Sequence, residues 1–190
     1  VNALMAGLRD VNVGVMQFNG NEGGSVIAPF EDIETSRDSV IAIVDALSAA
    51  GSTPLSETLY EAAQFFRGAD VDYGNAGSIR SVAGSRIGND ISSPLYRSPI
   101  TEACSKNFII LLTDGEPAND ASANSKIVAL PGFGALVGPA CDGSGEGRCL
   151  DDVAAWLLGQ DLDNTLPGQP NVVTHTIGFE ADFPLLVSTA

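Results

Sequence analysis

Two oxygen-bearing side chains, Thr53 and Asp114, stand where a cation could be bound. Asp114 follows an apolar run at 108–112, and Thr53 lies in a short loop that opens onto a predicted helix. A hydroxyl and a carboxylate on fixed loops suit Mg²⁺, which retains several waters and takes few protein oxygens. Thr53 and Asp114 are therefore candidate ligands of one divalent cation, with Mg²⁺ as the expected ion.

Each of these residues also has a simpler explanation. Thr53 could be only the N-cap of the helix that begins near Pro54, a role worth about 1 kcal/mol. Asp114 could be only a turn residue, because Gly115 and Pro117 follow it and end the strand. Spacing alone favours the cap for Thr53, and for Asp114 it favours neither role.

The elements that would position these residues alternate between strands and helices. The apolar run at 108–112 predicts a strand covered on both faces, as in a parallel sheet, with Asp114 beyond its carboxyl end where ligands gather. Pro29 cannot donate to a ladder, so its strand belongs at a sheet edge. The alternation predicts an α/β fold: a doubly wound, mostly parallel sheet with one antiparallel edge strand. The other predicted strands are 11–18, 25–30 and 172–177, and the predicted helices are 1–9, 36–50, 54–66, 121–130 and 150–158.

Two long segments show no sustained hydrophobic period. Residues 68–104 are rich in Gly, Ser and Asn, so we expect a loop-rich insertion there. Residues 131–149 are also predicted to be loop, and Cys141 and Cys149 flank their Gly-rich end. A disulfide between these two cysteines could close a small ring, which favours an oxidising compartment. Cys104 would then be buried or paired outside this chain.

The segment from Asp142 to Gly147 resembles a calcium loop, with oxygens at alternate positions and glycine at the sixth. The twelfth position is Val153, where a bidentate Glu belongs. We therefore expect a surface loop bounded by a disulfide, and not a calcium site of that type.

Little in the chain favours catalysis. His175 is the only histidine, and no nucleophile elbow, phosphate loop or dinucleotide-binding fingerprint follows a predicted strand. A hydrolase with an aspartyl nucleophile could use Asp114, but Glu116 stands where its second Asp is expected. We predict that the chain is not an enzyme and keep an aspartate-dependent hydrolase as an alternative.

The composition favours one acidic globular domain over residues 1–190. The chain is 44% hydrophobic, and 24 acidic against 9 basic residues give a formal charge of −15. This charge repels nucleic acids and anionic lipid surfaces, so cations and basic surfaces are better partners. The longest apolar run is far short of the roughly 18 residues that indicate a membrane span. Because the chain starts inside a predicted helix, we expect a fragment or a processed protein.

Two phrases together resemble the von Willebrand factor type A domain. They are Gly51-Ser52-Thr53-Pro54-Leu55 and Ile109-Ile110-Leu111-Leu112-Thr113-Asp114-Gly115, at this separation and in this order. In that family a metal-ion-dependent adhesion site takes a D-x-S-x-S segment, a Thr from a loop like that around Thr53, and an Asp like Asp114. The resemblance implies that Thr53 is a direct metal ligand and that Asp114 is a direct or water-mediated one.

Longer stretches resemble the type A domains of PilY-type proteins, the adhesins and biogenesis factors of type IV pilus tips. The resemblance covers nearly the whole chain and includes residues 13–19, 106–117, 149–152 and 174–179. It implies an extracellular, pilus-associated adhesion module that binds protein partners, such as pilus components or a surface receptor. The alternative is a structural module that docks in pilus assembly without metal.

The chain departs from that family in one respect, because no D-x-S-x-S segment occurs in it. In the family this segment ends the first, central strand, directly before the helix that Val1 to Arg9 resembles. We therefore expect a domain without its first central strand, whose two neighbouring strands have unpaired ladder groups. Thr53 and Asp114 would then supply only half of the metal shell.

Overall fold

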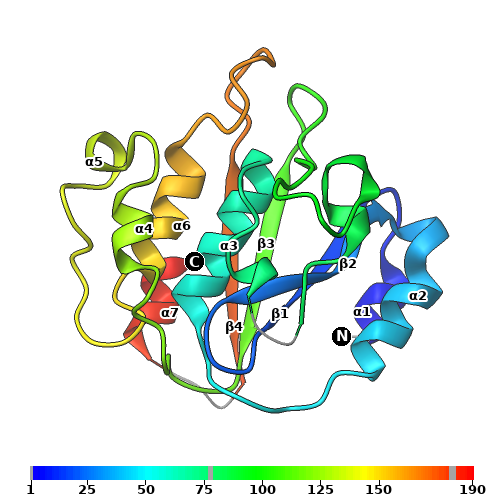
Figure 1. The fold of residues 1–190 in the computed structure, drawn as a ribbon, viewed down its shortest axis with the longest axis horizontal. Coiled ribbons are helices and arrows are strands. Elements are labelled where there is room, and N and C mark those ends of the chain that lie inside the picture. The colour runs from blue at the N-terminus through cyan, green and yellow to red at the C-terminus, as the bar shows by residue number, and fades with distance from the viewer. Residues whose placement is uncertain (1, 77–78, 180–182) are drawn as a thin grey trace.

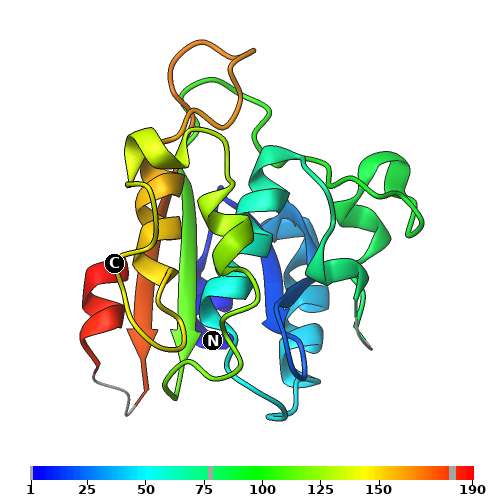
Figure 2. The ribbon, with the colours of Figure 1, turned by 60° about the vertical axis from the view of Figure 1, so that its left-hand side comes forward.

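The computed structural model describes residues 2–76, 79–179 and 183–190, which form a mixed α/β structure with two small sheets. Strand β1 (Asn12–Phe18) pairs antiparallel with β2 (Gly24–Asp32), and β3 (Asn107–Thr113) pairs in parallel with β4 (Val172–Gly178). Figures 1 and 2 show the two pairs side by side, with helices packed around them. The predicted strands, the antiparallel pair and the mixed α/β class are therefore present, and the described strands form two separate pairs, as expected where a central strand between them is missing from the chain.

Seven α-helices occur in the described residues. The helix predicted at 36–50 ends earlier, at Asp45, and it also begins earlier because the side chain of Asp32 accepts a hydrogen bond from Glu34 N and caps it. Helices α5 and α7 were not predicted. Helix α5 is a single turn inside a Gly-rich loop, which is too short to show a hydrophobic period. The bounds are α1 Asn2–Gly7, α2 Ile33–Asp45, α3 Leu55–Arg67, α4 Asn124–Val128, α5 Phe133–Leu136, α6 Leu150–Gly159 and α7 Pro184–Thr189.

Only one face of the β3–β4 pair is covered. Leu111 is buried in the core, whereas Phe108 and Ile110 on the opposite face are 52% and 49% exposed. Ile177 on β4 lies beside Leu112 and is exposed too. The prediction that the strand at 107–113 is covered on both faces is therefore wrong, because no element of the described chain packs on this second face.

Helix α3 is the centre of the core. Every residue of α3 except Arg67 is buried, and the helix packs against β1, β2 and α6. From α6, the fully buried Trp156 donates a hydrogen bond to Pro131 O at 2.9 Å, and the guanidinium of Arg67 lies 5.7 Å from the centre of its ring. This packing fixes the position of the first turn of α3, and the acidic pocket described below is built around that turn.

The segment 68–104 is more ordered than its composition predicts. It contains short 3₁₀ helices at Tyr73–Asn75, Ala83–Ser85 and Ile87–Asn89, and it contributes Tyr96 and Ile100 to the core. Two buried charged side chains hold the segment through hydrogen bonds. Glu61 on α3 accepts from its backbone, and Arg86 within the segment donates to its backbone. Cys104, in contrast, is exposed, so of the two roles expected for it burial is wrong, and pairing outside this chain stays a prediction.

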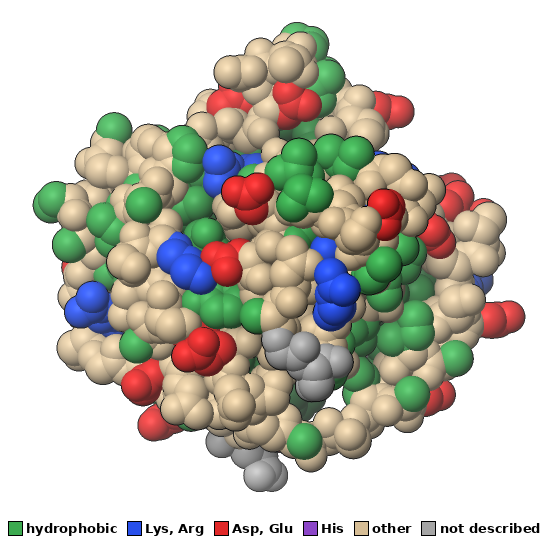
Figure 3. All heavy atoms as spheres, viewed as in Figure 1, with side chains coloured by type: hydrophobic (Ala, Val, Ile, Leu, Met, Phe, Trp, Pro, Cys, Tyr) green, Lys and Arg blue, Asp and Glu red, His purple; other side chains and the backbone are tan. Residues whose placement is uncertain are grey.

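The surface carries the acidic charge without concentrating it on the face shown in Figure 3, where Asp and Glu side chains are scattered. Among the described residues, the only ion pair joins Lys126 Nζ to Asp72 Oδ2 at 2.7 Å. No helix in the described ranges is long and apolar enough to cross a membrane. Most carboxylates in the described ranges therefore form no ion pair with a basic side chain.

Candidate metal-binding sites

The structure brings the loop of Thr53 next to the turn that contains Asp114. Asp114 is the first residue after β3 and is exposed, and the hydroxyl of Thr113 closes the turn by accepting a hydrogen bond from Gly115 N at 3.2 Å. The backbone N–H of Ala118 donates to Thr53 O at 3.1 Å. Thr53 Oγ1 lies 3.9 Å from the point that a Cβ on Gly115 would occupy. The Thr53 hydroxyl thus lies near the turn that follows β3, beside the residue after Asp114.

Thr53 does not cap helix α3, contrary to the interpretation that spacing alone favours. The N-cap position is Pro54, without a side-chain cap. The carboxylate of Asp120 takes this role instead, because it accepts hydrogen bonds from Ser56 N at 2.8 Å and Glu57 N at 3.0 Å. Within the described residues the Thr53 hydroxyl makes no hydrogen bond, which leaves its oxygen available to a ligand.

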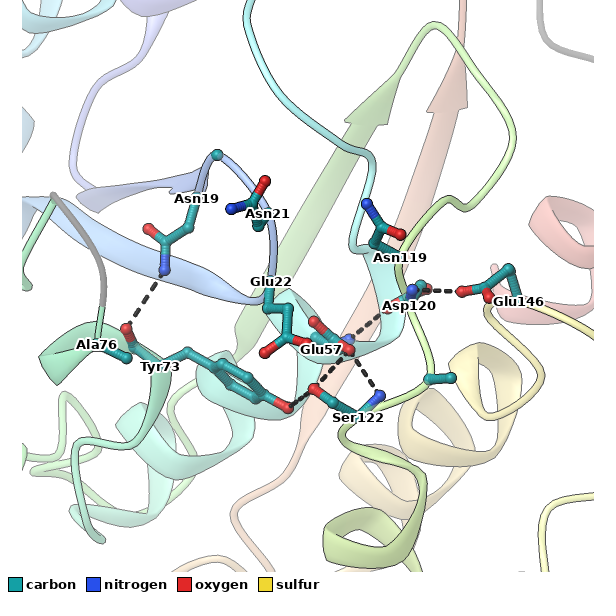
Figure 4. A pocket seen from close by; sticks show the side chains of 12 residues that line it. Asn19, Asn21, Glu22, Glu57, Tyr73, Ala76, Asn119, Asp120, Ser122 and Glu146 are labelled. Carbon is teal, nitrogen blue, oxygen red and sulfur yellow. Dashed lines mark hydrogen bonds between the residues drawn. The ribbon is translucent and has the colours of Figure 1, made fainter.

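An acidic pocket of about 750 Å³ lies beside this edge (Figure 4). It is bounded by the turn between β1 and β2, the first turn of α3, the segment 119–122 and Glu146. The fully buried Glu57 ties these parts together, because its carboxylate accepts from Gly23 N, Ser122 N and Ser122 Oγ, each at 2.8 Å. Asn119 Nδ2 donates to Ser52 Oγ at 2.6 Å and joins the pocket to the Thr53 loop.

The electrostatics of the pocket favour positively charged ligands. Glu22, Glu57, Asp120 and Glu146 line it, and no Lys or Arg side chain does. Burial, with a smaller contribution from the charge of Glu57, raises the pKa of Asp120 from 3.8 to about 6, although hydrogen bonds from Ser56 and Glu57 N act against the rise. The sequence gives no local signal for this pocket, because its carboxylates come from four separate segments.

A second acidic cluster lies at the start of α6, next to the disulfide loop. One carboxylate oxygen from each of Asp142, Asp151 and Asp152 lies within 4.8 Å of the others, so the cluster could hold a metal ion. Cys141 and Cys149 also lie close to Asp152. Their sulfur atoms are joined in a disulfide, as predicted, so they are not thiolate ligands.

Removing the Cys141–Cys149 disulfide should destabilise the fold moderately. The two cysteines are separated by 8 residues, and closing a loop of that length constrains the unfolded chain by about 2–3 kcal/mol. We expect a Cys141→Ser/Cys149→Ser variant to unfold at lower urea concentration by that amount. Cys104→Ser is the control, because its thiol is exposed and unpaired. A double variant as stable as the control would contradict the prediction.

Comparisons with protein-family models, with curated proteins and with solved structures found no match. The class of the protein is therefore defined by its own structure. It is a mixed α/β protein with a threonine and an aspartate near the end of β3, an acidic pocket and an acidic cluster at a disulfide loop.

Proposed function

We propose that the chain is the adhesion module of an extracellular, type IV pilus-associated protein. In this proposal Thr53 and Asp114 help to hold a Mg²⁺ ion, and a carboxylate of the partner completes the shell. The observation that carries the proposal is the position of the Thr53 hydroxyl. It makes no hydrogen bond among the described residues, and it lies 3.9 Å from the point that a Cβ added to Gly115, the residue after Asp114, would occupy. The sequence resemblance to PilY-type domains supplies the biological setting.

The donor atoms of Thr53 and Asp114 fit Mg²⁺. A hydroxyl and a carboxylate are hard oxygen ligands of the kind that Mg²⁺ takes, and the exposure of Asp114 leaves the ion accessible to a partner. The bound ion supplies a positive charge that attracts the carboxylate of a partner. The role of Thr53 and Asp114 is to fix that charge at the surface by coordination, without covalent chemistry.

Two further observations are consistent with a place outside the cell. The Cys141–Cys149 disulfide indicates a non-reducing environment. The formal charge of −15 disfavours nucleic acids and anionic lipids, which supports a protein partner.

The proposal predicts that Asp114→Ala abolishes metal-dependent attachment. In the full natural protein, we expect EDTA to reduce attachment of piliated cells, Mg²⁺ to restore it, and Asp114→Ala to remove the restoration. The loss should be at least about tenfold, because the ion-bridged contact is the central one of the interface. Attachment is counted on cells with equal numbers of pili.

Glu116→Ala is the matched control, since it removes a neighbouring exposed carboxylate that the proposal does not use. Attachment that survives both EDTA and Asp114→Ala would overturn the metal-bridged mechanism and favour docking without metal. If Glu116→Ala lowered attachment as much as Asp114→Ala does, the loss would be explained by the missing surface charge and not by a missing metal ligand.

A further inference from the structure

We propose that Asp142, Asp151 and Asp152 form a Ca²⁺ site that joins the disulfide loop to the first turn of α6. The site is separate from the Thr53 and Asp114 edge, and it does not follow the linear spacing of a calcium loop. One of its carboxylates comes from the loop after Cys141, and the other two come from consecutive residues of the helix.

The strongest support is a buried carboxylate oxygen of Asp152 that has no hydrogen-bond partner. Asp152 is only 6% exposed, and its Oδ2 atom is buried without any hydrogen-bond partner. A carboxylate oxygen of Asp152 lies within 4.8 Å of oxygens from Asp142 and Asp151. An unpaired polar atom in the interior is costly unless a ligand satisfies it. A cation bound among the three residues would do so.

The charges around the cluster point in the same direction. Carboxylate oxygens of Asp142 and Asp151 lie within 4.8 Å of one from Asp152, so three acidic groups are gathered at one point. No Lys or Arg side chain forms an ion pair with the cluster in the described part of the chain. The positive end of the α6 dipole favours carboxylates in the first turn, but it does not supply a partner for the buried oxygen.

The ligand set and the surroundings favour Ca²⁺ over Mg²⁺. Mg²⁺ usually binds one or two protein carboxylates and keeps several waters, whereas Ca²⁺ takes about six to eight oxygen ligands, among them several carboxylates. Three carboxylate oxygens within 4.8 Å of one another fit inside one such shell. Ca²⁺ also accepts irregular shells, and because Asp142 is exposed, water can complete the coordination. We expect a dissociation constant of about 10⁻⁴–10⁻³ M, as in extracellular calcium modules.

The only tryptophan of the chain provides a direct assay. Trp156 lies one helical turn after Asp152 on α6, so Tb³⁺ bound at the cluster should emit when the indole is excited. We expect saturable Tb³⁺ emission at pH 7, displaced by Ca²⁺ and displaced at least about tenfold less effectively by Mg²⁺. Either Asp142→Asn or Asp152→Asn should weaken Ca²⁺ competition and Tb³⁺ binding at least about tenfold.

Two matched variants isolate the cluster. Asp38→Asn removes an exposed carboxylate on α2, and Asp114→Asn removes the one proposed for adhesion, so neither should change Tb³⁺ emission. Asp142 is exposed, so Asp142→Asn tests the site even where Asp152→Asn impairs folding. Absence of saturable emission would overturn the proposal, and so would emission that Asp142→Asn leaves unchanged. Emission lost in Asp114→Asn but kept in Asp142→Asn would assign the ion to the strand edge instead.

Discussion

Replacing Glu61 with alanine should lower the free energy of unfolding by about 3–5 kcal/mol, because four hydrogen-bond donors lose a buried acceptor. Glu61 is fully buried on α3. Its Oε1 accepts from Asp72 N at 3.1 Å, Gly74 N at 2.9 Å and the Tyr96 hydroxyl at 2.6 Å. Its Oε2 accepts from Tyr73 N at 3.0 Å. The substitution therefore leaves the start of the 68–104 segment detached from the helix.

The comparison of Glu61→Ala with Glu61→Gln separates hydrogen bonding from size. Glutamine can keep the acceptor at Oε1 but places an NH₂ group against Tyr73 N, so it should destabilise less than alanine does. Glu102→Ala removes an exposed carboxylate and should change stability by no more than about 0.5 kcal/mol. Urea unfolding followed by Trp156 fluorescence measures all three variants.

The pH dependence of stability should also change in Glu61→Gln. Burial raises the pKa of Glu61 from 4.5 to about 7, although hydrogen bonds from Tyr96, Gly74 and Tyr73 act against the rise. Between these pH values the folded state holds a proton that the unfolded state has lost, so stability falls as pH rises. Asp120 and Asp152, each with a pKa raised to about 6, add a fall with the same sign at lower pH.

Glu61→Gln should therefore flatten the part of the profile between about pH 6 and 7 while the fall below pH 6 persists. An unchanged slope above pH 6 would mean that Glu61 is ionised throughout and that its hydrogen bonds outweigh its burial. A Glu61→Ala variant as stable as Glu102→Ala would contradict the anchoring role itself.

The sequence predicts the regular elements well because their signals are local. The apolar run at 108–112 and the three-to-four spacing in α3 and α6 are each contained within one element. The arrangement of the strands is not local, since β1 pairs only with β2 and β3 only with β4 in the described chain. Local patterns also could not show that Phe108 and Ile110 face solvent, because exposure depends on which elements pack against the strand.

The candidate sites also include features that the local sequence predicts and features that only the fold shows. The cysteine spacing predicts the Cys141–Cys149 disulfide, which the structure contains. The local rule for Thr53 fails, because Asp120 reaches back across 64 residues to cap α3. The acidic cluster at α6 was also missed as a site. Asp151 and Asp152 look like ordinary first-turn carboxylates, and only the fold shows that the Oδ2 atom of Asp152 is buried without a partner.

Replacing Arg86 with methionine should destabilise the 68–104 segment by about 2–4 kcal/mol. Arg86 is fully buried, and its Nε donates to Ser81 O at 2.9 Å. Its Nη1 donates to Asn75 Oδ1 at 2.6 Å and Ser93 O at 3.0 Å, and its Nη2 donates to Gly74 O at 2.9 Å. Methionine fills much of the same volume but leaves these acceptors without a donor.

Hydrogen exchange should show where that stability is lost. We expect Arg86→Met to remove amide protection within 73–76 and 79–97 while β3 and α6 keep theirs, because the segment can open as a local unit. Arg86→Lys should be nearly as disruptive, since one ammonium group cannot reach all the acceptors that the guanidinium fork contacts. Arg80→Met is the matched control: Arg80 also donates to Asn75 but is exposed, so the cost should be below about 1 kcal/mol. Protection that survives in Arg86→Met would show instead that the buried Tyr73 and Tyr96 hold the segment in place through apolar packing alone.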